Sequence, residues 1–103
     1  MKAYAEVQTF HVKEDLVSIK LNNVTIKEEE NIRNYVGMPV LVTDEENSVY
    51  LGKFILDNFK IDKNNIVSIQ LKTELSLIDP HAIIEVTKRH TAELDIKTEQ
   101  VMF

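Results

Sequence analysis

The chain of 103 residues has no cysteine and no tryptophan, and it has only two glycines and two prolines. Without cysteine there is no disulfide framework, no thiolate ligand for a metal and no thiol nucleophile. The two glycines, Gly37 and Gly52, are too few for a glycine-rich loop that cradles phosphate. These absences exclude several common kinds of functional site.

Long hydrophobic runs are also missing. No apolar run approaches the ~20 residues that a membrane-spanning helix needs, and residues 1–6 lack the hydrophobic core of a signal peptide. We therefore expect a cytoplasmic protein without a membrane partner, or a virion component if a phage encodes it. The abundance of Lys, Ile, Asn and Glu is typical of AT-rich genomes, such as those of low-GC bacteria and their phages.

The chain is rich in β-branched residues. Val, Ile and Thr together account for 29 residues, whereas only four are Ala. Branched Cβ atoms suit pleated strands better than helices, so the composition favours β-structure. The length predicts one domain, residues 1–103. The net charge of −5 disfavours general nucleic-acid binding because it repels phosphate, although the same charge also serves solubility.

The sequence nearly repeats itself. Residues 16–21 read Leu-Val-Ser-Ile-Lys-Leu, and residues 66–71 read Ile-Val-Ser-Ile-Gln-Leu. A repeat of this length predicts one supersecondary unit that is used twice.

The strand before each copy contains the same irregularity. Apolar residues step by three where a regular strand takes two, from Val7 to Phe10 and again from Leu56 to Phe59. One extra residue is what a β-bulge inserts. The sequence therefore predicts paired bulges at equivalent points of the two units.

Polar turns separate the two strands of each unit. Residues 13–15 and residues 62–65 are rich in Asp, Asn, Glu and Lys, which predicts hairpin loops of three to four residues. In the first unit, residues 28–36 then predict a short helix, which Gly37 ends. A strand is predicted at residues 40–43.

The second unit is predicted to differ after its hairpin. Asp79-Pro80 is expected to prevent a full helix, and residues 83–87 predict the strand that matches residues 40–43. The internal repeat thus covers residues 3–43 and 52–87. An extra amphipathic strand is predicted at residues 91–97, outside the repeat.

The predicted fold class is mainly β: a small antiparallel, pseudo-two-fold β-barrel with one short α-helix. The sequence Gly-Met-Pro-Val-Leu-Val at residues 37–42 is similar to the turn and strand of the cradle-loop barrels, but lacks their Asp. The order of predicted elements also resembles these barrels, which are built from two ββαβ halves. This resemblance concerns the fold alone. The alternative is a five-stranded OB- or SH3-like barrel with an added strand.

Residues with catalytic chemistry do not form a recognisable pattern. The histidines His11, His81 and His90 have no ligand spacing, so we expect no metal site and no cofactor. Ser18 and Ser68 recur in the repeat, but they lie on polar strand faces without the sharp turn that presents a nucleophile. We therefore expect a protein that is not an enzyme.

The sequence leaves three functional hypotheses open. The first is a non-enzymatic protein-interaction or structural module, such as a phage or prophage accessory protein. It would bind a protein partner or a second copy of itself through the strand at residues 91–97, through an apolar tail or through acidic segments. The candidate residues are Val101, Met102, Phe103, Glu28, Glu29, Glu30, Asp44, Glu45 and Glu46.

The other two hypotheses involve nucleic acid or its mimicry. A single-stranded nucleic-acid-binding barrel would use a lysine-bearing sheet face with Tyr4 or Tyr50 as a stacking platform. The candidate lysines are Lys13, Lys20, Lys53, Lys60 and Lys72. An acidic DNA mimic that inhibits a nucleic-acid enzyme would instead require the six acidic candidates to form one continuous stripe.

Overall fold

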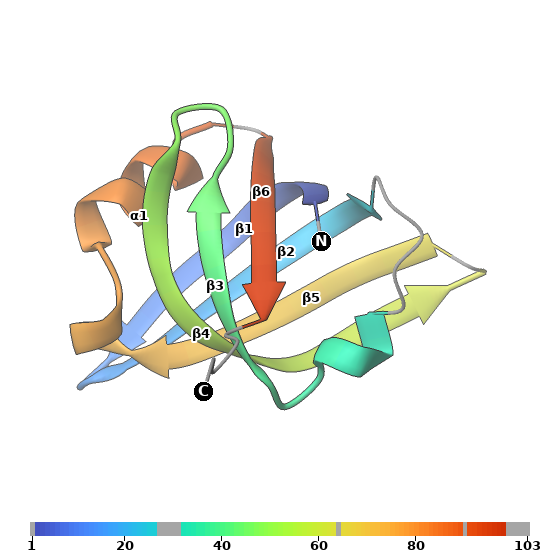
Figure 1. Ribbon diagram of the computed structural model, residues 1–103, viewed down its shortest axis with the longest axis horizontal. Helices are drawn as coiled ribbons and strands as arrows, with labels where there is room; N and C mark the ends of the chain where they lie inside the picture. Colours follow the sequence, from blue (N-terminus) through green and yellow to red (C-terminus); the bar gives the residue numbers. More distant parts are fainter. Residues whose placement is uncertain (1, 27–31, 64, 90, 99–103) are drawn as a thin grey trace, which may run out of the picture.

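The computed structural model describes residues 2–26, 32–63, 65–89 and 91–98, and it confirms the predicted fold class (Figure 1). Six antiparallel strands close into a barrel in the order β1-β2-β5-β4-β3-β6. The strands are β1 (Lys2–Lys13), β2 (Leu16–Ile26), β3 (Pro39–Asp44), β4 (Val49–Asp62), β5 (Asn65–Glu74) and β6 (Ala92–Thr98). A single α-helix, α1 (Pro80–Thr87), lies beside β1 and β4 within the part of the chain that is described.

The two hairpins of the barrel are joined through their second strands. β2 and β5 run antiparallel, and Lys20 lies opposite Gln70. These two residues hold the same position in the repeated sequence, so a pseudo-two-fold axis passes between them.

The third strand of each unit follows the same symmetry. Ala3 of β1 pairs with Leu94 of β6, just as Gly52 of β4 pairs with Val42 of β3. β6 therefore has the place in the second unit that β3 has in the first, so it is not an extra strand. Because β6 pairs with β1 on one side and with β3 on the other, its predicted use as an edge for another subunit is wrong.

The strand predicted at residues 83–87 is wrong, because these residues belong to α1. Asp79 is the N-cap, and its Oδ1 accepts a hydrogen bond of 3.2 Å from the backbone N–H of Ala82. Pro80 at the first turn suits a helix start, where its missing N–H is not needed. The Asp-Pro pair thus begins the helix that it was expected to prevent.

Tertiary packing explains why β-branched residues adopt this helix. Ile83 and Val86 are three positions apart on one helical face, and both are buried in the barrel core. Burial of that face outweighs the weak preference of Ile and Val for strands.

The helix predicted at residues 28–36 is only partly within the described residues. A 3₁₀ helix, η1 (Ile32–Tyr35), is present there, with Ile32 buried. Gly37 follows at φ +79°, in the left-handed conformation that the sequence predicted for it. The three glutamates at 28–30 lie outside the described residues.

Both predicted bulges are confirmed. The pairing of β1 with β2 shifts between Val7 and Thr9, and the pairing of β4 with β5 shifts between Leu56 and Asn58. The hairpin turns are shorter than predicted, because only two residues separate Lys13 from its partner Leu16, and the same holds for the second hairpin.

The barrel interior holds one apolar core, to which all six strands, Ile32 of η1 and the inner face of α1 contribute. Figure 1 shows β3, β6 and the first half of β4 in front of the diagonal strands β1, β2 and β5. A second 3₁₀ helix, η2 (Leu75–Leu77), joins β5 to α1 and lies against β4. This contact between η2 and β4 forms the candidate site.

Candidate functional site

A further irregularity, in β4, shapes the outer surface of the barrel. The pairing of β3 with β4 shifts after Val42, because Val42 pairs with Gly52 whereas Thr43 pairs with Tyr50. Leu51 is the additional residue. Bulges of this kind bend a strand and redirect its side chains.

Gly52 allows the segment after η2 to lie directly on this bulge. The glycine has φ +154°, and a Cβ atom there would be 2.7 Å from Ile78 Cγ2 and 2.8 Å from the Leu77 carbonyl oxygen. The backbone N–H of Asp79 also donates a hydrogen bond of 2.9 Å to the carbonyl of Leu51. Any side chain at this glycine would therefore push the two segments apart.

Beside this contact, β4 and η2 enclose an open hollow of about 690 Å³ on the outer surface. The hollow presents three exposed apolar side chains: Val49 (37% exposed), Tyr50 (50%) and Leu77 (44%). The remaining lining residues are Ser48, Lys53, Ser76, Ile78 and Asp79. Because the hollow is open to solvent, it suits a few side chains of a peptide lying across the surface better than an enclosed small molecule.

The polar groups of the hollow are few. Asp79 already caps α1 through its carboxylate, and the two serines have no histidine or second carboxylate among the lining residues. The arrangement suits the burial of apolar side chains beside one ammonium group, that of Lys53. Clustered exposed apolar side chains of this kind mark interaction surfaces more often than isolated ones do.

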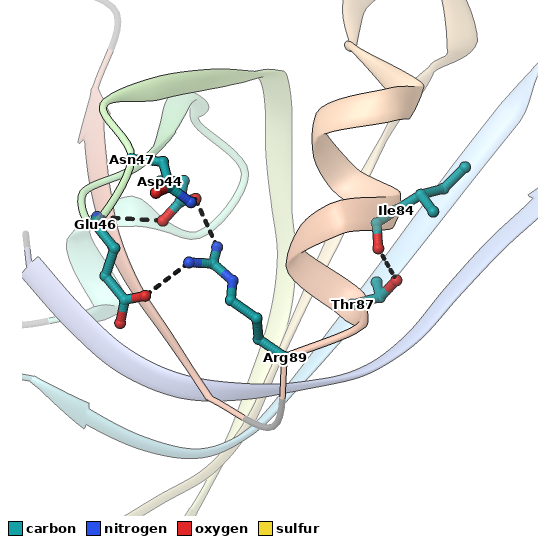
Figure 2. A network of polar contacts seen from close by, with 6 residues as sticks. All are labelled: Asp44, Glu46, Asn47, Ile84, Thr87 and Arg89. Carbon is teal, nitrogen blue, oxygen red and sulfur yellow. Dashed lines mark hydrogen bonds and ion pairs between the residues drawn. The ribbon is translucent and has the colours of Figure 1, made fainter.

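A second polar cluster connects the β3–β4 hairpin to the end of α1 (Figure 2). The guanidinium of Arg89 lies 2.6 Å from Asp44 Oδ2 and 2.7 Å from Glu46 Oε2. Asn47 Nδ2 donates a further hydrogen bond of 3.2 Å to Asp44 Oδ2. Asp44 is only 2% exposed, so this cluster is a structural clamp on the helix end.

The acidic candidates therefore do not form a free stripe in the described structure. Asp44 and Glu46 bind Arg89, and Glu45 lies 3.3 Å from the ammonium of Lys2. The other acidic candidates and the apolar tail at 101–103 lie outside the described residues. No sequence pattern pairs Arg89 with Asp44, because 45 positions separate the two.

The lysine candidates divide into two groups. Lys13, Lys20, Lys60 and Lys72 lie on one outer sheet face, whereas Lys53 lines the hollow. Of the two tyrosines expected as a stacking platform, Tyr50 lines the hollow, and Tyr4 is 40% exposed with its hydroxyl donating a hydrogen bond to Thr91.

Within the described residues, histidines and carboxylates do not gather into a metal site. Across the described ranges, no group of three or more His, Asp or Glu side chains is placed to hold an ion. His11 and His81 are exposed on different elements, and His90 lies outside these ranges.

Comparison with known protein families, curated proteins and solved structures finds no match to this chain. No helix in the described part of the chain has the length and apolar character that crossing a membrane requires.

Proposed function

We propose that this chain is a non-enzymatic protein-interaction module that holds a segment of a partner protein in the hollow between β4 and η2. The observation that carries the proposal is the grouping of Val49, Tyr50 and Leu77 around this hollow, each more than a third exposed. When a partner removes exposed apolar side chains from water, little hydration free energy is lost. Tyrosine is also enriched at protein interfaces.

The chemistry of the lining predicts the kind of segment that binds. Apolar side chains of the partner would pack against Tyr50 and Leu77, and an acidic group would lie near the Lys53 ammonium. The acidic-mimic hypothesis has less support, because Asp44 is buried and bound to Arg89.

A displayed library of random peptides tests this proposal. We expect enriched peptides to contain apolar residues, and their affinity to fall by at least about tenfold when Tyr50→Ser and Leu77→Ser are combined, because each truncation removes an interface contact of about 1 kcal/mol or more. Isothermal titration calorimetry with the enriched peptides gives the affinities.

The matched control is Ile61→Ser. Ile61 is 41% exposed, close to the value for Leu77, but it lies near the tip of the β4–β5 hairpin. Equal affinity of the enriched peptides for the double variant and for the unchanged chain would overturn the proposal.

A further inference from the structure

The outer face of strands β1, β2, β5 and β4 carries lysines on a rigid polar surface. We call Lys13, Lys20, Lys60 and Lys72 the lysine face. Strand register places three of them on one side of the sheet, because Lys20 pairs with Gln70, Lys60 with Ser68 and Lys72 with Ser18. Lys13 lies on the same side, because it pairs with Leu16, which is two residues from Ser18 along β2. All four side chains are exposed.

Hydrogen bonds across the strands hold the surface between these lysines. Gln70 Nε2 donates to Ser18 Oγ at 3.2 Å, and Asn58 Nδ2 donates to Gln70 Oε1 at 3.4 Å. These contacts join β2, β5 and β4 on the outer side of the barrel. The amides are thereby ordered beside the ammonium groups.

The local charge of this face differs from that of the whole chain. Asp57 is the carboxylate within it, and it lies 3.2 Å from Lys72. Lys20 and Lys60 are surrounded by Thr9, Asn22, Ser68 and the amides. Glu6, Glu74 and Asp62 lie around its margin. Among the described residues, Asp57 is thus the one carboxylate among the four lysines within the face, whereas the whole chain carries −5.

The spacing of the lysines fits a chain of phosphates. Neighbouring strands are about 4.8 Å apart and residues rise about 3.4 Å along a strand. Lys20 and Lys72 differ by one strand and two residues, which is roughly 8 Å. Lys20 and Lys60 differ by two strands and two residues, roughly 12 Å. Both separations can be spanned by nearby phosphates of one flexible nucleic-acid strand.

We propose that the lysine face binds single-stranded nucleic acid through its phosphates, without reading the base sequence. Phe10 and Phe59 pack against the core and Tyr50 lines the hollow, so stacking on these three rings is not part of the contact. Phosphates are favoured over a protein partner because the centre of the face is polar. Ile55, 40% exposed, is an apolar residue at its margin.

Fluorescence anisotropy of a labelled oligothymidine, measured at increasing salt, tests the inference. Four phosphate contacts predict that the logarithm of the binding constant falls with the logarithm of salt concentration with a slope of about −3. In the combined variant Lys20→Gln and Lys60→Gln, we expect the slope to become less negative by about 1.4 units, because two contacts are removed. We also expect a loss of affinity of about tenfold or more at low salt.

The control changes the net charge equally at a different place. Lys2→Gln and Lys88→Gln remove two lysines that pair with Glu45 and Glu85, away from the lysine face. Equal loss of affinity in both double variants would mean that only total charge matters, and would overturn the inference.

Two further measurements distinguish single-stranded nucleic acid from other polyanions. Labelled polyglutamate that binds as tightly as the oligonucleotide would replace the proposal with an acidic protein partner, and tighter binding of a duplex would contradict the single-strand assignment. The variant with Tyr50→Ser and Leu77→Ser should bind oligothymidine as the unchanged chain does, so the two surfaces succeed or fail separately.

Discussion

At the scale of single residues, Asp44 is an acidic side chain whose burial makes it depend on its partners. Its carboxylate is 2% exposed and receives contacts from Arg89, Asn47 and the backbone N–H of Glu46. A buried carboxylate that loses a cationic partner keeps its desolvation cost without the compensating attraction. We therefore expect the free energy of unfolding to depend on Arg89, even though this residue lies just after the end of α1 and not in the core.

The variant Arg89→Met tests the clamp. We expect the free energy of unfolding to fall by about 2–3 kcal/mol, somewhat below the range for a wholly buried pair, because the Arg89 side chain is partly exposed. Urea denaturation followed by circular dichroism measures the change. The control Lys88→Met breaks an exposed pair with Glu85 and should cost less than about 1 kcal/mol. Similar losses in both variants would contradict the structural role of the clamp.

At the scale of elements, the sequence predicts the irregularities of strands better than it predicts helices. The steps from Val7 to Phe10 and from Leu56 to Phe59 locate both bulges, because burial of one sheet face fixes which residues point inward. The sequence predicts a strand where α1 lies because the eight residues of this helix include Ile and Val, and its inward face is defined by contacts with distant strands.

The candidate hollow is not predictable from the sequence for a similar reason. Tyr50 can be recognised as a candidate surface aromatic, but its setting depends on the bulge at Leu51 and on the segment around Leu77. These two segments are more than twenty positions apart. The lysines are easier to predict, because alternation along strands places Lys20 and Lys60 on outer faces.

The start of α1 provides a test at this scale. In Asp79→Ala, the backbone N–H of Ala82 loses its carboxylate acceptor, so we expect the free energy of unfolding to fall by about 1 kcal/mol. Thermal and urea unfolding measure the loss. Asp79→Ser keeps an oxygen acceptor at the cap and should retain most of the stability. An equal loss in the serine variant would show that the cap is not the cause.

At the scale of the whole molecule, the two units interlock. The third strand of each unit pairs with the first strand of the other, as β3 with β4 and β6 with β1. Two further strand pairings join the units, that of β2 with β5 and that of β3 with β6. Each unit therefore has most of its strand partners in the other half of the chain.

This interlocking predicts the behaviour of fragments. Residues 1–46 and residues 47–103 should each be largely unfolded alone, because the separated strands have unpaired edges and half a core. Mixed in equal amounts, they should recover the β-sheet circular dichroism spectrum of the intact chain. A fragment that unfolds cooperatively by itself would contradict the interlocked arrangement.

The pseudo-two-fold axis between Lys20 and Gln70 has a consequence for how far the two halves of the chain can differ. In a two-fold homodimer every substitution appears twice, once in each subunit. In a single chain with the same pseudo-symmetry, one half can carry a feature that the other half lacks. Over the described residues of β1, from Lys2 on, the β4 bulge at Leu51 has no counterpart in the pairing of β1 with β6, where Ala3 stands in the position of Gly52. The hollow is thus confined to one half of the pseudo-symmetric barrel, and the closed ring of six strands does not depend on it.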